Sequence, residues 1–260
     1  MYFASPVVWL GLASTNSLSE LYRSHGWVGL GGEFIRNVGD ALAYDDGIYG
    51  RWVVNSLIYC LVGAGATTAV SLTAGYAVAT YDFRGRRAVL GLAVSSLMIP
   101  ATALAFPTYR LLMAFGLADS YWGILLPSLV YPFGVLLSYA YALTAVPREV
   151  LEAARMDGAG EWRTFRSVAF PMLRSGAVTV MLFAFMVSWN SYLLPLLVLT
   201  DQRLFPLTVG LTAWSQVADK LPGMKILALT GSLIAVAPVI LVFAMLQRYW
   251  QSGLATGAVK

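Results

Sequence analysis

Residues that commonly carry catalysis are few in this chain of 260 residues. Its one histidine, His25, stands in a polar stretch, and its one cysteine, Cys60, stands in an apolar run, where a cysteine packs as a small hydrophobe. The glycine-rich residues 26–32 contain no lysine and precede Glu33, so they do not form the G-x-x-x-x-G-K-[ST] loop that holds nucleotide phosphates. We therefore predict no catalytic residue, no metal site and no cofactor in this chain, and no enzyme activity of its own.

A polar segment, residues 147–171, has the most regular pattern of charged and apolar side chains. Arg148, Glu152 and Arg155 recur at the spacing of one helix face. The opposite, apolar face is formed by Val150, Leu151 and Ala154. Gly158 then fits a helix stop, because glycine adopts a positive φ at little cost. The pattern predicts a helix, a glycine turn and a second short amphipathic helix that ends near a proline.

Two interpretations of this segment are open from its residues alone. A short helix lying parallel to the membrane could fit a socket on a soluble partner, whose motion would then move the membrane spans as rigid bodies. The same amphipathic pattern is also typical of a helix that lies on lipid headgroups.

The remaining sequence indicates that lipid surrounds most of the chain. It is 58% hydrophobic and 12% charged, about half the charged fraction of soluble domains. Five stretches without Asp, Glu, Lys or Arg each reach the length of about 20 residues that crosses a bilayer as a helix. We predict spans around them at residues 52–81, 88–112, 120–146, 172–200 and 224–248, with kinks at Pro100 and Pro107.

Residues 1–14 add a shorter apolar stretch. We interpret it as part of a first span whose beginning is missing from this chain; an interfacial or re-entrant segment is the alternative. The fold class is then an all-α polytopic membrane protein of about six transmembrane helices. It forms a single domain over residues 1–260, with residues 15–51 external and residues 147–171 between the fourth and fifth spans.

The loops indicate how the chain is oriented. Basic residues gather in the loop at 82–87, in the 147–171 segment and after the last span. Lys and Arg collect on the cytoplasmic side of membrane proteins, so these regions and the C-terminus are predicted to be cytoplasmic. The same rule accounts for the net charge of +4 without a nucleic-acid partner.

The predicted spans are built on runs without charged residues, which indicates what could supply the energy for transport. Ion-coupled transporters usually carry intramembrane Asp, Glu or Arg. Since these runs lack such residues and the chain has no phosphate loop, ATP-driven transport would need an ATPase on another polypeptide. An ATPase-independent channel or scaffold is the alternative of a different class.

The 147–171 segment resembles the EAA signature of bacterial ABC importer permeases. The match consists of Glu152-Ala153-Ala154, Gly158, Val168 and Phe170-Pro171 at the signature's spacing, with Val168 and Phe170 where the family has Ile and Leu. Met156-Asp157-Gly158-Ala159 is typical of the carbohydrate branch of that family. Trp189-Asn190 with Pro195 is similar to its fifth-span pattern, and residues 253–260 look like the end of the maltose-type second permease subunit.

The resemblance implies a transport mechanism and a set of partner proteins for this chain. A permease of this type pairs with a second, similar subunit in the bacterial inner membrane. It takes its solute from an extracytoplasmic binding protein and is driven by two copies of a cytoplasmic ATPase, which bind ATP and Mg. The resemblance implies coupling to this ATPase through Glu152, Ala153, Ala154, Met156, Asp157 and Gly158. It also makes the tail a candidate ATPase contact, at Gly257, Ala258, Val259 and Lys260.

The solute is less closely determined. Trp189, Asn190 and Tyr192 could line the path, because an aromatic ring offers an apolar face to a sugar and an Asn amide both donates and accepts hydrogen bonds. The alternative is an interfacial aromatic belt with a helix-packing Asn. Only Arg110 lies near a span, so a neutral sugar is favoured over an anion. A glycerol-phosphate-type or peptide solute is the alternative.

Overall fold

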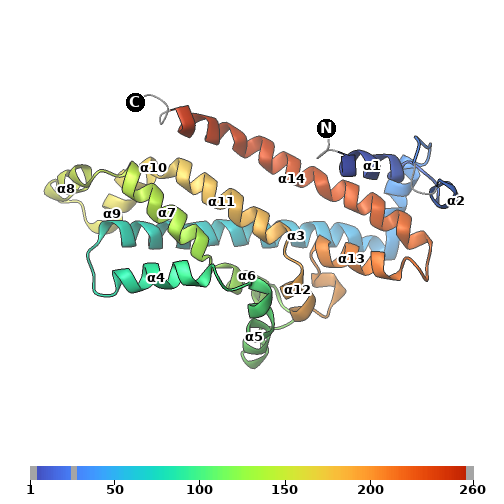
Figure 1. Cartoon of the computed structure of the whole chain (residues 1–260), viewed down its shortest axis with the longest axis horizontal. Coiled ribbons are helices and arrows are strands. Elements are labelled where there is room, and N and C mark those ends of the chain that lie inside the picture. Colours follow the sequence, from blue (N-terminus) through green and yellow to red (C-terminus); the bar gives the residue numbers. More distant parts are fainter. Residues whose placement is uncertain (1–4, 25–27, 256–260) are drawn as a thin grey trace. The chain divides into compact units, whose positions relative to one another are not determined.

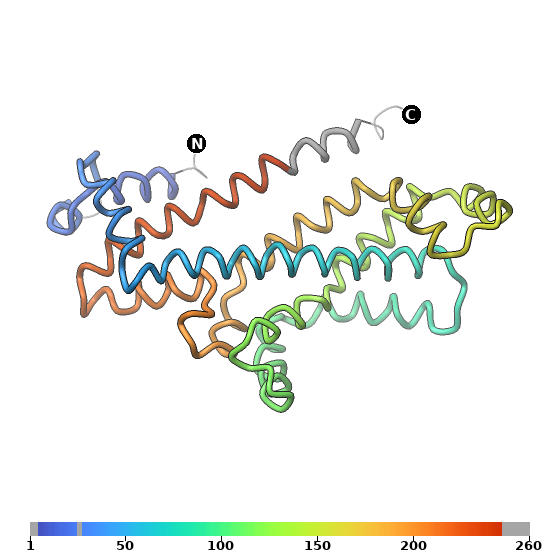
Figure 2. The backbone as a smooth tube through the Cα atoms, turned by 180° about the vertical axis from the view of Figure 1, so that it is seen from behind, coloured from blue at the N-terminus to red at the C-terminus, as the bar shows by residue number. Residues whose placement is uncertain are grey.

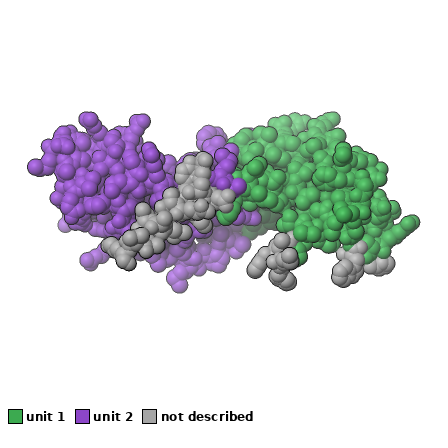
Figure 3. All heavy atoms as spheres, turned by 90° about the horizontal axis from the view of Figure 1, so that it is seen from above, with its two compact units in different colours: residues 1–58, 191–243 green, residues 59–190, 244–260 purple. Residues whose placement is uncertain are grey.

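Helices joined by turns and short irregular connections make up the part of the chain that the computed structural model describes, residues 5–24 and 28–255 with side chains up to residue 245 (Figure 1). His25 and the tail residues 257–260 lie outside this part. The all-α membrane-permease fold class is thereby confirmed at the level of secondary structure. The chain divides into two compact units, residues 1–58 with 191–243 and residues 59–190 with 244–260 (Figure 3).

The first unit is built from both ends of the sequence. It contains α1 (Ser5–Ser14), α2 (Leu18–Arg23), the first part of α3 (Phe34–Thr80), α12 (Leu193–Val198), the 3-10 helix Gln202–Leu204, α13 (Leu207–Val217) and most of α14 (Gly223–Ala255). Trp214 lies at its centre, with ring centroids 5.9 Å from Tyr49 and 4.9 Å from Trp52. Burial of these large rings stabilises this unit.

The second unit holds the segment of interest. It contains the rest of α3, then α4 (Arg86–Ser96), α5 (Ala101–Ala114), α6 (Tyr121–Ser128) and α7 (Pro132–Ala145). After α7 come α8 (Arg148–Met156), α9 (Glu161–Thr164), the π-turn Phe165–Ala169, α10 (Phe170–Met172) and α11 (Arg174–Trp189). Helix α7 packs against both α4 and α11.

Small residues let α3 and α7 approach closely. A Cβ added at Gly75 would lie 2.5 Å from the Cβ of Ser138, and one at Gly134 would lie 2.7 Å from the Oγ of Ser71. Close backbone contact through glycine and serine is a common way for helices to associate in lipid. The lipid tails are as apolar as the side chains there, so no hydrophobic force drives the helices together. The two helices therefore form a tightly packed pair in the second unit.

The predicted spans differ from the observed helices in their bounds and straightness. Among the described residues, three helical stretches are long and apolar enough to cross a membrane by length and composition: residues 34–80, residues 121–145, which comprise α6 and α7, and residues 223–245. The predicted span 88–112 is instead two helices, α4 and α5, which are bent by 108° at a break before Ala101 (Figure 2). Pro100 stands at this break, as expected for a residue that cannot continue the helix before it. Pro107, the other predicted kink, lies inside α5.

The predicted span at 172–200 is also divided. Helix α11 ends at Trp189, and α12 begins only at Leu193. At its other end α11 is bent by 80° from residues 161–172, and counting each bent pair as one span gives up to five crossings. Residues 15–51 were predicted as an external segment, but α3 already begins at Phe34 and is interrupted by positive φ angles at Asp45, Asp46 and Gly47.

Candidate functional site

Helix α8 ends in the glycine turn that its sequence predicts. Gly158 has φ +79°, which glycine adopts without the strain of a Cβ. The N–H of Gly158 donates to the carbonyl oxygen of Arg155, and the N–H of Ala159 donates to that of Ala154, both at 3.0 Å. This pair of bonds is a Schellman motif, which satisfies carbonyls that have no partner further along the helix. The predicted helix stop at Gly158 is confirmed.

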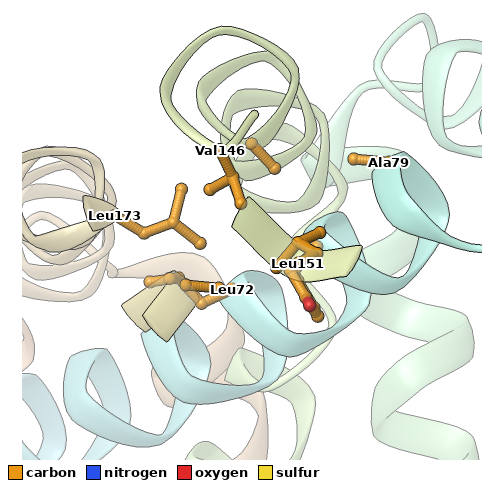
Figure 4. Packing of buried hydrophobic residues seen from close by; sticks show 8 residues of the cluster. Leu72, Ala79, Val146, Leu151 and Leu173 are labelled. Atoms are coloured by element: carbon orange, nitrogen blue, oxygen red, sulfur yellow. The ribbon is translucent and has the colours of Figure 1, made fainter. Parts of the chain in front are cut away.

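One side chain fixes α8 to the body of the second unit. Leu151 is 3% exposed and belongs to a buried cluster drawn from α3, α7, α8, the π-turn and the turn before α11 (Figure 4). Its apolar neighbours there include Leu72, Ala79, Val146 and Leu173. Val150 and Ala154, which were predicted to share the apolar face, are only partly covered. The contact of α8 with the core is therefore narrow.

The opposite side of α8 is open to solvent. Met156 is 89% exposed, and Trp162 on α9 is 67% exposed. Of the residues that the resemblance assigns to coupling, Ala154 is half-buried and the others are exposed: Glu152, Ala153, Met156, Asp157 and Gly158. Small side chains beside a projecting methionine form a surface that another protein can approach closely. In an isolated soluble protein, large apolar side chains exposed in this way often mark an interaction site.

The charged face of α8 has a partner across the glycine turn. Arg155 pairs with Glu161, with Nε to Oε1 at 2.9 Å and Nη2 to Oε2 at 3.2 Å. The hydroxyl of Tyr81 donates to Oε2 of the same carboxylate at 2.6 Å. The bonds from Arg155 and then Tyr81 hold the pKa of Glu161 below its usual value.

The arrangement of Tyr81, Arg155 and Glu161 was not predicted from the sequence. Tyr81 is separated from Glu161 by 80 residues, and no local spacing rule connects them. The one available signal was the pair of opposite charges on either side of Gly158, because a turn that reverses the chain brings its flanks together.

The second half of the segment is not a regular α-helix. Residues Phe165–Ala169 form a π-turn, in which the N–H of Phe170 donates to the carbonyl oxygen of Phe165. π-turns are rare in proteins, and those that occur are often found at functional sites. Phe165 packs on Tyr76 of α3, with ring centroids 5.0 Å apart, and Ala169 is fully buried in the same cluster as Leu151. The helix continues past Pro171 to Met172, so the predicted break comes slightly later, at Leu173.

The candidate path residues lie at the interruption between α11 and α12. Trp189 stacks on Phe185 with centroids 5.7 Å apart, and the Nδ2 of Asn190 donates to the carbonyl oxygen of Met186 at 2.8 Å. Asn190 therefore caps the last turn of α11, a local role that its sequence position does not reveal. Tyr192 precedes α12 and belongs to the other compact unit. Their contact with a solute stays a prediction.

Comparison with known proteins gives the family. Residues 71–255 match the family described as binding-protein-dependent transport system inner membrane component. The chain is 32% identical to the arabinooligosaccharides transport system permease protein AraQ of Bacillus subtilis, over 100% of this chain and 92% of that protein. It is 30% identical to the lactose transport system permease protein LacG of Rhizobium radiobacter, over 98% and 90% of the two chains.

A solved structure supports the fold. A chain from the crystal structure of a bacterial ABC transporter involved in the import of the acidic polysaccharide alginate superposes with a TM-score of 0.82. The match covers 95% of this chain and 90% of the other at 21% sequence identity, so it concerns the fold alone. The family match over residues 71–255 and the 32% identity to AraQ show the family: this chain belongs to the binding-protein-dependent transport system inner membrane components and is a permease subunit of an ABC importer.

Proposed function

We propose that this permease forms half of the translocation path for a sugar-like solute and is driven through the 147–171 segment by a separate ATPase. One observation carries the proposal: α8 exposes most of the residues assigned to coupling while Leu151 is buried in the core of the second unit. A helix held in this way can receive a push from a partner and pass it to the helices that surround Leu151.

The docking surface would consist of Glu152, Ala153, Ala154, Met156, Asp157 and Gly158. The small alanines allow a socket wall to come close, and the exposed Met156 offers an adaptable apolar side chain. The carboxylate of Glu152 makes no ion pair within the described residues, so it is free to meet a basic group of the ATPase. The tail residues Gly257, Ala258, Val259 and Lys260 would add a second contact with the same partner.

The complete transporter would contain further chains. A second, similar permease subunit completes the path, two copies of the ATPase bind ATP and Mg on the cytoplasmic side, and an extracytoplasmic solute-binding protein delivers the solute. In this arrangement the present chain binds no cofactor. The 147–171 segment and the C-terminus face the cytoplasm, as the basic residues of the loop at 82–87 and of the segment favour.

A sugar is the solute that the relatives favour, since their names specify arabinooligosaccharides and lactose. Trp189, Asn190 and Tyr192 are proposed to line the path. A binding assay on the partner solute-binding protein, with a neutral oligosaccharide and a glycerol-phosphate ester as probes, tests this choice. Tighter binding of the ester than of every neutral sugar tried would contradict it.

Cross-linking tests the docking. In a Cys60→Ser background the chain has no other cysteine, so Ala153→Cys introduces a single exposed thiol on α8. We expect this thiol to cross-link to the co-expressed ATPase. The matched control, Gln202→Cys, places an exposed thiol on the 3-10 helix between the last two predicted spans, on the side opposite the cytoplasmic 147–171 segment in the predicted orientation, and should give no product. An ATPase that never co-purifies with the chain would support a channel or scaffold instead.

Charge reversal gives a second test. Glu152→Lys should lower solute-stimulated ATP hydrolysis while the complex still assembles, because it places a positive charge against the basic group expected in the socket. Glu149→Lys, an exposed position in the first turn of the same helix, is the matched control and should have a smaller effect.

A further inference from the structure

Three side chains from separate parts of the second unit converge beside the docking helix. Tyr81 directly follows α3, and its N–H still donates to the carbonyl oxygen of Ala77 at 3.0 Å. Arg155 is in the last turn of α8, and Glu161 is the first residue of α9. The carboxylate of Glu161 binds both partners at once, as described above. We call these three residues the 81–155–161 network.

The network gives α8 a defined orientation, which its buried contact at Leu151 does not. Leu151 is the one fully buried side chain of α8, and an apolar contact has no preferred direction. A helix attached at one apolar point can roll about its axis. Hydrogen bonds between a guanidinium and a carboxylate are directional and bidentate, so they select one orientation. The network therefore fixes which residues of α8 face outward.

The network also connects α8 to the end of α3. The guanidinium carbon of Arg155 lies 6.0 Å from the centre of the Tyr81 ring, and the same ring meets Tyr76 edge-on with centroids 6.1 Å apart. Tyr76 packs on Phe165, which in turn lies 5.6 Å from Trp162 on α9. Polar and aromatic contacts thus run in parallel from α8 and α9 to α3.

We propose that Tyr81, Arg155 and Glu161 are positioning residues that hold the docking helix in one orientation and transmit its displacement to α3. This inference rests on the proposed docking of α8 on an ATPase. A push on α8 then moves the end of α3, because the carboxylate of Glu161 binds Arg155 of α8 and Tyr81 at the end of α3. Without the network, α8 would shift or rotate without displacing α3.

The test uses the complete importer in proteoliposomes, with the partner permease, the ATPase and the solute-binding protein. The variants are Tyr81→Phe, which removes one hydroxyl and keeps the ring, and Glu161→Gln, which removes the charge. We expect each to lower solute-stimulated ATP hydrolysis per bound ATPase by about threefold or more, within the range by which residues along a coupling route alter coupling. Basal hydrolysis and the amount of ATPase bound should stay as in the wild type.

Two controls separate positioning from a merely structural effect. Glu149→Gln removes an exposed carboxylate of α8 that has no ion pair within the described residues, and it should leave stimulation unchanged. The double variant Arg155→Glu with Glu161→Arg restores opposite charges and should recover part of the stimulation that Arg155→Glu alone loses.

The outcomes are distinct. Wild-type stimulation that persists in Tyr81→Phe and Glu161→Gln would overturn the network while leaving the docking proposal intact. A loss of bound ATPase in proportion to the loss of activity would also overturn it, because the residues would then serve assembly only. If the wild-type chain binds no ATPase, the proposed function itself fails.

Discussion

The N–H of Ala159 donates to the carbonyl oxygen of Ala154 at 3.0 Å, around a Gly158 whose φ is +79°. A Cβ added at Gly158 would have no atom within 4 Å, so the constraint at this position is the backbone conformation alone. Gly158→Ala should therefore destabilise the turn by about 1 kcal/mol.

Thermal unfolding in detergent and the yield of co-purified ATPase measure this effect. Gly160→Ala is the control, because Gly160 has φ −67° and is equally open, and it should change stability by only a few tenths of a kcal/mol, roughly. Gly158→Asn should be milder than Gly158→Ala, since Asn tolerates the left-handed region better. Equal effects of Ala at positions 158 and 160 would contradict the assignment.

Truncation of the buried anchor should have a larger effect than any change on the exposed face of α8. Leu151→Ala removes a side chain that is 3% exposed and should cost about 2–5 kcal/mol. Val150→Ala, at a neighbouring side chain 39% exposed, should cost well under half of that. The measurement is the midpoint of thermal unfolding for both variants. A similar loss for both would mean that Leu151 does not anchor the helix.

The carboxylate of Glu161 gives the network a defined pH dependence. Its pKa is lowered in the folded chain by Arg155 and Tyr81, so its stabilising contribution is fully present above the ordinary Glu pKa of about 4.3. The contribution is lost as the pH falls through the lower, folded-state pKa. Between about pH 6 and pH 8 the network should therefore be insensitive to pH.

Thermal unfolding of the wild type and of Glu161→Gln at decreasing pH checks this sign. The stability difference between the two should be constant near neutrality and should shrink in acid, because only the wild type loses an ionised group there. A difference that grows on acidification would show that the charge of Glu161 destabilises the fold.

The close contact of α3 with α7 makes one glycine of α3 sensitive to substitution. A Cβ at Gly75 would lie 2.5 Å from Ser138 and 2.6 Å from the backbone nitrogen of Tyr139, so Gly75→Ala should destabilise the pair by about 1–3 kcal/mol. Gly65 lies in the same helix with no atom within 4 Å of an added Cβ, and Gly65→Ala should be neutral or stabilising. Unfolding in detergent compares the two. A stable Gly75→Ala variant would contradict the observed packing.

Local patterns in the sequence predicted the parts of the site that depend on neighbouring residues. The end of α8 at Gly158 follows from glycine's backbone freedom, and the burial of Leu151 follows from helical periodicity. Glu152 is exposed on the charged side of α8, as the pattern placed it, whereas Ala154 is half-buried. Their binding to an ATPase stays a prediction.

Features that depend on distant contacts were not predictable in this way. The link from Glu161 to Tyr81 joins two residues 80 positions apart. An apolar run shows how long a segment is but not whether it is straight. Pro100 therefore indicated a kink in this run, but the sequence did not predict a bend as large as the 108° between α4 and α5. The Asp45–Gly47 interruption of α3 has no comparable signal, because two of its three positive-φ residues are not glycine.

The π-turn at Phe165–Ala169 has a consequence for how the segment can change in length. A π-turn holds one residue more than a regular α-helical turn, and each residue of an α-helix advances the chain by about 100° around the axis. Deletion of one residue there would convert the turn to α-helix and swing everything before it, α8 included, out of phase with α11. Substitutions at the surface of this segment are therefore far easier to accommodate than insertions or deletions. The number of residues in the segment sets the direction in which the docking helix points.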